Sequence, residues 1–264
     1  MNQPTGQPLT LLTLHAEARV VGTRFLLSSE ISSTRLEVNE GAVEFKRRNS
    51  GELLVVKNGF TATASPNTDF AARPFLPAPW ASQDIGAVGL RGRARFDGAA
   101  FRVCGAGQDT CCQKDQLHFV YQPLEGDGEI RAYVRELEFT DPEAKSGVMI
   151  RQSLKSASPQ VSLGVTAAGA LEFEHRSKTE SRLEKPGRAP APCWLRLVRQ
   201  GDLFTAYKSG DGTNWIETGS STVPMRGRVY VGLGVTSYNH AALSASLFER
   251  VSVKAASAEA AKMF

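Results

Sequence analysis

The sequence predicts an all-β protein with two domains, and three observations support this. Apolar and polar residues alternate along most of the chain, which is the period-two pattern of strands with one buried face. Turn dipeptides such as Asn58–Gly59 interrupt that pattern. The segment "ARPFLPAPW" has three prolines in nine residues, and it is typical of an extended linker because proline cannot donate to a β-ladder. The predicted boundaries are a β domain at 1–71, the linker at 72–80, a larger β domain at 81–254 and a tail at 255–264.

Short alternating stretches predict the strands of the first domain. Ala18–Ser29 is expected to form an early strand. Thr34–Phe45 alternates, turns at Glu40–Gly41 and then alternates again. Glu52–Ala64 repeats this strand–turn–strand pattern around Asn58–Gly59, two residues that tolerate a positive φ. We therefore expect a small β domain that ends near Ala71.

Longer strands follow the linker. Their spacing, with turn residues between them, is typical of a β-sandwich or jelly roll. The expected strands are Gln116–Pro123, Glu129–Glu136, Gly147–Ser153, Gln160–Val165, Leu171–Arg176, Trp194–Gln200, Phe204–Ser209, Val229–Thr236 and Leu243–Val253. Only the alanine-rich tail Lys254–Phe264 favours a helix, and it is too short to be stable alone.

Composition and charge exclude several classes of function. The 264 residues are 41% hydrophobic and carry a net charge of +4, as in an ordinary soluble protein. The longest basic run is "FKRRN" (Phe45–Asn49), which fits a solvated turn better than a nucleic-acid surface. No apolar run approaches the ~20 residues of a membrane helix, and no basic segment precedes Leu9–Leu14 as in a secretion signal. We expect either a cytoplasmic protein or part of a longer exported one.

About fifty residues of the first domain resemble the extracytoplasmic β domain of the FecR family of transmembrane sigma-factor regulators. The resemblance rests on the "GTxF" strand (Gly22, Thr23, Phe25), the "LEVxEGxV" stretch (Leu36–Val43) and the "GxxA" turn (Gly59–Ala62). It implies that the domains lie outside the cytoplasmic membrane. The cytoplasmic helices and membrane helix of such regulators are absent here, which implies an upstream anchor.

Trp80 to Val253 resembles the concanavalin A-like family labelled "regulation of enolase". Matching motifs occur in order, among them "DQLHFVYQPLEGDGEIRAYV", "AKSGVMIRQSL", "WLRLVRQGDLFTAYKSGDGTNW" and "VYVGLGVTSYN". The resemblance implies a jelly roll. It implies no reaction, but the family often occurs in bacterial cell-surface and carbohydrate-related proteins.

The four cysteines could form a site or a structural pair. Cys111 and Cys112 are adjacent in a glycine-rich loop, and the other two are Cys104 and Cys193. Their spacing, with His118 six residues after Cys112, does not match the paired ligands that zinc prefers. A disulfide from Cys111 or Cys112 to Cys104 or Cys193 would suit an oxidising compartment. The alternative is four thiols that only fill space.

Catalytic motifs are not found in the sequence. The four histidines are in no HExxH motif, and no serine lies in a nucleophile elbow. Glucanases with this type of fold place an acid and a nucleophile with the pattern "ExDxxE", which is absent here. Glu172 and Glu174 share one strand face, and we expect a solvated edge there. Asp211–Gly212 is expected to form a hairpin turn, with Trp215 packing against the next strand. We expect no catalytic residue, no cofactor and no metal.

The polar sides of several strands suggest a binding face instead. Alternation is expected to point Leu117, Phe119 and Tyr121 inward and their polar neighbours to the opposite side. If the strands adjoin, these polar residues share one face. Arginine forks bind hydroxyls and carboxylates, and aromatic rings stack on sugars. The predicted ligand-binding residues are His118, Arg131, Tyr133, Met149, Arg151 and Arg196. The alternative is a polar face in which these arginines form ion pairs with Glu129 and Glu174.

Taken together, these observations predict a non-catalytic, extracytoplasmic binding or sensing protein. The predicted partner is a carbohydrate or cell-surface ligand, and no nucleic acid. Two other classes stay open: a glycan-cleaving hydrolase of concanavalin A-like fold, and a structural surface or assembly protein. A hydrolase needs two converging carboxylates in its groove, whereas an assembly protein needs a large exposed apolar patch.

Overall fold

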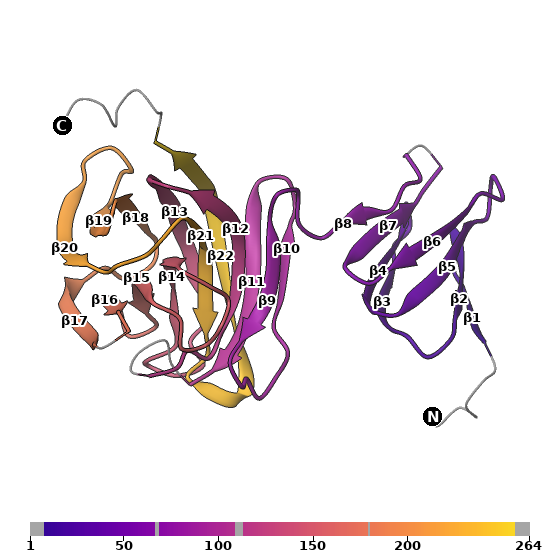
Figure 1. Ribbon diagram of the computed structural model, residues 1–264. Helices are drawn as coiled ribbons and strands as arrows, with labels where there is room; N and C mark the ends of the chain where they lie inside the picture. Colours follow the sequence, from indigo (N-terminus) through magenta and orange to yellow (C-terminus); the bar gives the residue numbers. More distant parts are fainter. Residues whose placement is uncertain (1–7, 67–68, 109–112, 179, 257–264) are drawn as a thin grey trace. The chain divides into compact units, whose positions relative to one another are not determined.

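The prediction of an all-β protein is confirmed. The computed structural model describes residues 8–66, 69–108, 113–178 and 180–256, and every regular element among them is a β-strand (Figure 1). In these ranges no helix is long and apolar enough to cross a membrane. The chain divides into two compact units, Met1–Pro77 and Ala78–Phe264, and each is described separately below.

The N-terminal unit contains two four-stranded antiparallel sheets, in the orders β1-β2-β5-β6 and β3-β4-β7-β8. The strands are β1 (Leu9–Leu12), β2 (Ala16–Val20), β3 (Arg24–Ser29), β4 (Thr34–Glu40), β5 (Ala42–Arg47), β6 (Leu53–Lys57), β7 (Phe60–Ala64) and β8 (Arg73–Pro74). Strand β8 lies inside the segment expected to be a linker, where Thr61 pairs with Arg73. This part of the chain therefore belongs to a sheet of the N-terminal unit.

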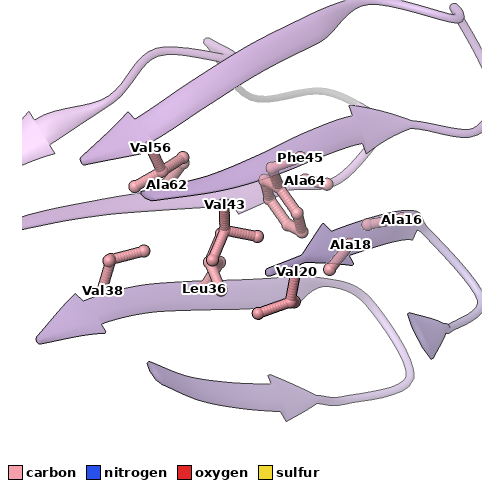
Figure 2. Packing of buried hydrophobic residues seen from close by; sticks show 10 residues of the cluster. All are labelled: Ala16, Ala18, Val20, Leu36, Val38, Val43, Phe45, Val56, Ala62 and Ala64. Atoms are coloured by element: carbon pink, nitrogen blue, oxygen red, sulfur yellow. The ribbon is translucent and has the colours of Figure 1, made fainter. Parts of the chain in front are cut away.

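Alternation explains the core of this unit. Alternate residues of β2, β4, β5 and β7 are almost fully buried and meet between the two sheets, together with Val56 of β6 (Figure 2). The chain changes sheet at tight turns, because β4 and β5 belong to different sheets and so do β6 and β7. Gly41 and Gly59 occupy these turns with φ of 78° and 81°, values that favour glycine. The expected single strand Ala18–Ser29 is two strands, β2 and β3, separated at Gly22 (φ 59°).

The C-terminal unit is a sandwich of two seven-stranded antiparallel sheets. Sheet I has the order β10-β11-β22-β13-β18-β19-β20, and sheet II has the order β17-β16-β15-β14-β21-β12-β9. The strands of sheet I are β10 (Arg93–Phe96), β11 (Ala100–Gly107), β13 (Gly128–Leu137), β18 (Cys193–Gln200), β19 (Leu203–Ser209), β20 (Ile216–Thr222) and β22 (Asn239–Ala255). Those of sheet II are β9 (Ala81–Ile85), β12 (Leu117–Glu125), β14 (Lys145–Arg151), β15 (Gln160–Thr166), β16 (Ala170–Arg176), β17 (Ser181–Arg188) and β21 (Arg228–Thr236).

All nine strands expected after the linker are present, and five more strands accompany them. The additional strands are β9, β10, β11, β17 and β20. Strand β17 is exposed at every position, so it lacks the alternation that would have predicted it. At the other end of the chain, β22 continues through Lys254 to Ala255, where the sequence favoured a helix. Residues 257–264 of that tail lie outside the described residues.

The two sheets pack through their inner faces. Ile130 and Leu195 of sheet I and Val148 and Ile150 of sheet II are fully buried there. The hydroxyls of Ser146 and Ser246 hydrogen-bond at 2.6 Å from one sheet to the other. Residues of the opposite parity point away from this core. The sandwich therefore has two outer faces, one on each sheet.

Candidate functional site

The residues predicted to form one ligand face lie on two different sheets. His118, Met149 and Arg151 belong to sheet II, whereas Arg131, Tyr133 and Arg196 belong to sheet I. The prediction of a single face was wrong because it assumed that consecutive strands adjoin. Strand β13 pairs with β18 and β22, and both β12 and β14 pair with β21.

His118 points between the sheets and not to an outer face. Its Nδ1 is 2.7 Å from Oδ1 of Asp84, and its side chain packs under Gly92 and Gly105. Leu117 and Phe119, which were expected in the core between the sheets, instead form an apolar cluster with Met149 on the outer face of sheet II. A buried histidine in this position holds β9 against β12 and cannot contact a ligand.

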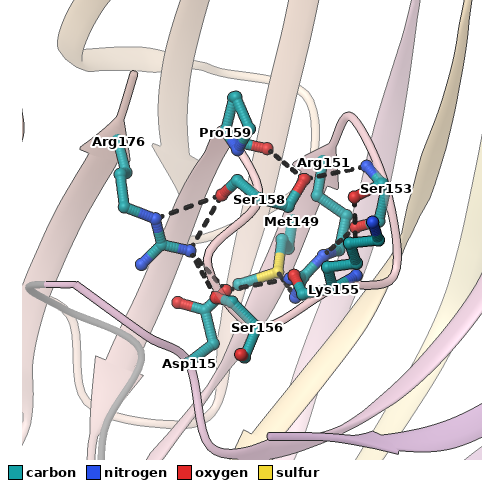
Figure 3. Close-up of polar contacts among 9 residues, drawn as sticks. All are labelled: Asp115, Met149, Arg151, Ser153, Lys155, Ser156, Ser158, Pro159 and Arg176. Atoms are coloured by element: carbon teal, nitrogen blue, oxygen red, sulfur yellow. Dashed lines mark hydrogen bonds and ion pairs between the residues drawn. The ribbon is translucent and has the colours of Figure 1, made fainter. Parts of the chain in front are cut away.

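Arg151 is also a structural residue (Figure 3). Its side chain is fully buried and contacts Oδ2 of Asp115 at 3.0 Å. Arg176 approaches the same oxygen at 2.6 Å. Burial raises the pKa of Asp115, while the two guanidinium groups oppose that shift. Burial also lowers the pKa of Arg151.

These arginines fasten the loop that follows β14. Arg151 donates to the carbonyl oxygens of Ser153 and Lys155 at 2.7 and 2.6 Å (Figure 3). Arg176 donates to the carbonyls of Ser156 and Ser158. The loop carries Leu154, which packs on the apolar cluster of the outer face. The Asp115 cluster, defined as Asp115, Arg151 and Arg176, therefore fixes this loop on sheet II.

A hollow remains on the outer face of sheet II, and its floor is made of glycines. Gly164, Gly147 and Gly234 are directly paired neighbours on β15, β14 and β21. The hollow is open to solvent, and its empty space is about 280 Å³ when the open solvent above it is included. Its remaining lining includes Leu117, Met149, Lys145, Ser162 and Thr236. The floor is roughly 10 Å across, because it spans two spacings between strands. We call this hollow the glycine groove.

Neighbouring atoms leave little room for a Cβ at two of these glycines. A Cβ at Gly147 would lie 2.2 Å from the carbonyl oxygen of Leu163. A Cβ at Gly234 would lie 2.8 Å from Cδ1 of Leu117. Gly164 differs, because its Cβ would lie 3.1 Å from the flexible Lys145 side chain and no closer to backbone than 3.4 Å, the distance to the carbonyl oxygen of Ser146. The groove can therefore be filled at Gly164 with less strain on the sheet than at Gly147.

One side of the groove carries buried charges. Nζ of Lys145 is 2.6 Å from Oε2 of Glu172 and also contacts Glu174. Nζ of Lys185 is 2.8 Å from Oε1 of Glu172. Both glutamates are 1% exposed, so the expectation of a solvated edge was wrong. Sequence reasoning did not identify Lys145. The alternation of β16 did indicate that the two glutamates face outward, because Phe173 between them faces the core.

The other side is apolar and aromatic. Phe119 stacks on Tyr121 with ring centroids 5.5 Å apart, and Tyr121 meets Tyr230 edge-on at 5.4 Å. Phe119 is paired with Gly234, and Glu172 is paired with Gly164. One row across the sheet thus runs from a carboxylate over three glycines to an aromatic ring. Phe119 and Glu172 are themselves buried, so an elongated ligand on this row would contact the lining of the hollow, with Ser162 at one end and Leu117 at the other.

On sheet I, Arg131 and Arg196 form ion pairs with Glu129. The Arg131 guanidinium contacts Oε1, and the Arg196 guanidinium contacts Oε2. These pairs confirm the Glu129 part of the polar face that was considered as the alternative to a binding face. Glu174 instead pairs with Lys145 on sheet II. Tyr133 lies beside Trp194, with ring centroids 5.3 Å apart.

The loop between β19 and β20 is a hairpin turn, as predicted. Asp211 accepts hydrogen bonds from the backbone amides of Thr213 and Asn214, and these bonds hold its pKa well below the usual range. A Cβ at Gly212 would lie 2.6 Å from the Trp194 ring. Asp211 therefore stabilises the turn.

Cys104 and Cys193 are buried, and neither is bridged to another cysteine among the residues that the structure describes. Burial raises the pKa of Cys193 to about 12, so this thiol is unreactive near neutral pH. Cys111 and Cys112 lie outside the described residues, and a bridge from either of them stays a prediction. Among the residues that the structure describes, no group of three or more His, Cys, Asp or Glu side chains is placed to hold a metal ion.

The C-terminal unit is a two-sheet β-sandwich of the jelly-roll class. No family model and no curated protein matches the sequence. Among solved structures, the chain is similar to a functionally unknown protein from Saccharomyces cerevisiae, with 12% identity, a TM-score of 0.53 and coverage of 62% of this chain and 92% of that one. A GH43 protein, BlXynB from Bacillus licheniformis, gives 10% identity, a TM-score of 0.49 and coverage of 94% and 65%. Lectin I-B4 from Griffonia simplicifolia gives 11% identity, a TM-score of 0.41 and coverage of 66% of this chain and 93% of that one.

Proposed function

We propose that this protein binds carbohydrate, without cleaving it, in the glycine groove on the outer face of sheet II. One observation carries the proposal. Three paired glycines leave a strip without side chains between the Lys145 ion pairs and the apolar side of the groove, which Leu117 lines. A flat ligand with an apolar face and polar edges is complementary to such a strip.

A sugar ring has this combination of surfaces. Its C–H face can lie on backbone and on apolar side chains such as Leu117 and Met149, which line the groove. Its hydroxyls need hydrogen-bonding partners at the rim. The Ser162 hydroxyl lines the groove and makes no hydrogen bond to any described residue, so it is available for this role.

The ion pairs favour binding over hydrolysis. A glycoside hydrolase needs one carboxyl group as acid and a second as nucleophile or base. Glu172 and Glu174 are the buried carboxylates at the groove, and both contact the Lys145 ammonium group. Each is therefore committed to an ion pair. Release of reducing ends from a bound glycan, lost in Glu172→Gln, would instead support a hydrolase.

Filling the groove tests the proposal. We expect Gly164→Val to weaken binding of the best ligand from a glycan array by tenfold or more, because its methyl groups occupy the floor, where the nearest atom belongs to the flexible Lys145 side chain. Isothermal titration calorimetry measures the change.

The matched control is Gly210→Val, since a Cβ at Gly210 has no atom within 4 Å. It should bind like the unmodified protein. Equal affinity for Gly164→Val, measured on a protein that melts normally, would remove the groove from the binding site. The absence of any array ligand would contradict the proposed function itself.

We also propose an extracytoplasmic location, based on the FecR resemblance of the first domain. The native full-length protein should fractionate with the periplasm, membrane or cell surface. Recovery of both units in the cytosolic fraction would contradict this location and would leave the groove proposal untouched.

A further inference from the structure

We propose that the outer face of sheet I holds a second binding site, which takes an acidic saccharide. The site consists of Arg131, Arg196 and Trp215, with Glu129 holding the two arginines. It lies on the sheet opposite the glycine groove, and it extends the proposed function to a second ligand surface. We call it the arginine clamp.

Glu129 fixes both guanidinium groups in one orientation. Oε1 accepts from Nε of Arg131 at 2.7 Å and contacts its Nη2 at 2.6 Å. Oε2 accepts from Nε of Arg196 at 2.8 Å and contacts its Nη2 at 2.5 Å. The Glu129 side chain is only 12% exposed. Each guanidinium group thus places two nitrogens on one carboxylate oxygen, so its remaining N–H groups are held in place before any ligand arrives.

The clamp has unused donors and an unbalanced charge. The Nη1 group of each arginine makes no hydrogen bond to any described residue, and the two side chains are 31% and 25% exposed. Two guanidinium groups against one carboxylate leave a net charge of +1. Lys254 on β22 lies opposite Glu129 in the register and adds a further cation nearby. An anionic group is therefore the favoured ligand.

Aromatic rings lie directly beside these donors. The guanidinium carbons of Arg131 and Arg196 are 5.7 and 5.8 Å from the Trp215 ring centre. Trp194 meets Trp215 edge-on at 6.3 Å. Rings of this kind stack on the C–H face of a sugar, and forked guanidinium groups bind carboxylate or sulfate. A sugar that carries either acid group satisfies both features at once.

The test uses oligogalacturonate as a carboxylated probe and a sulfated oligosaccharide of equal length as a second probe. The control ligand is the fully methyl-esterified oligogalacturonate, which keeps the rings and loses the charge. Arg131→Gln, Arg196→Gln and Arg196→Lys are compared with Arg182→Gln. Arg182 is a matched control because its Nε donates to the glutamate two residues before it, at 2.6 Å, as Arg131 does.

We expect one acidic probe to bind at least tenfold more tightly than the esterified ligand. Arg131→Gln and Arg196→Gln should each weaken that binding about tenfold or more, and Arg196→Lys should not restore it, because lysine lacks the fork. Arg182→Gln and Gly164→Val should bind normally, which separates this site from the groove.

Three results would overturn the proposal. The first is that the esterified ligand binds as tightly as the acidic probe. The second is that both Arg→Gln variants bind the acidic probe normally and have an unchanged melting temperature. The third is that Arg182→Gln weakens binding as much as the clamp variants do. If the Arg→Gln variants melt early, Arg196→Lys provides the second measurement, because it keeps the positive charge and loses only the fork. It should lose acid-selective binding while melting normally, and retained selectivity there would also count against the clamp. Tighter binding of single-stranded DNA of equal charge would assign the surface to a different class of ligand.

Discussion

Asp115→Ala is expected to lower the free energy of unfolding of the C-terminal unit by about 3–5 kcal/mol, because it leaves two buried guanidinium groups without their shared carboxylate. Asp115 and Arg151 are fully buried, and Arg176 is nearly so. Urea unfolding followed by tryptophan fluorescence measures this unit alone, since Trp80, Trp194 and Trp215 all follow Ala78. The Asp115 cluster also anchors the loop after β14 (Figure 3). Trypsin should therefore cut after Lys155 faster in the variant.

The control for this experiment is Glu180→Ala. Glu180 pairs with Arg182 on the surface, where the two side chains are 55% and 63% exposed, and such pairs are worth less than about 1 kcal/mol. If Asp115→Ala costs no more than this control, the cluster does not hold the loop.

Gly232→Ala is expected to be the most damaging of the glycine substitutions on sheet II. Its Cβ would lie 1.9 Å from the carbonyl oxygen of Val120 and 2.8 Å from Cα of Tyr121, which are backbone atoms of the adjacent strand β12. Overpacking typically costs about 1–3 kcal/mol, and sometimes more. We expect the upper end of this range, because backbone cannot move aside as a side chain can.

Gly164→Ala is the matched comparison on the same sheet. Its Cβ would lie 3.1 Å from the Lys145 side chain and no closer than 3.4 Å to backbone, so the cost should be small, and the reduced freedom of the unfolded chain offsets it by about 0.4–1 kcal/mol. Denaturation midpoints of the two variants give the comparison. Equal destabilisation would mean that the floor of the groove is not organised as described.

The sequence predicted the strands well and their neighbours poorly. Alternation is a local property, so it located the nine strands from Gln116–Pro123 onward and the core positions Val148 and Ile150. Pairing between strands depends on contacts far apart in the chain. Strand β22 lies between β11 and β13, and no local pattern indicates this. The predicted ligand face therefore combined residues of two sheets.

The candidate site was missed for a related reason. Leu117 and Phe119 are apolar and so were expected between the sheets, but Leu154 covers them on the outer face. Both faces of β12 are therefore buried, and alternation cannot distinguish them. The glycines that form the groove floor give no signal of their own until β14, β15 and β21 are known to be adjacent.

A crystal structure with the best array glycan bound would test the central claim most directly. We expect a sugar ring over Gly147, Gly164 and Gly234, with hydroxyl contacts to Ser162 or Lys145 and the ring plane along the row toward Phe119 (sheet II in Figure 1). A glycan found away from this floor, with the glycine groove empty at saturating concentration, would contradict the account.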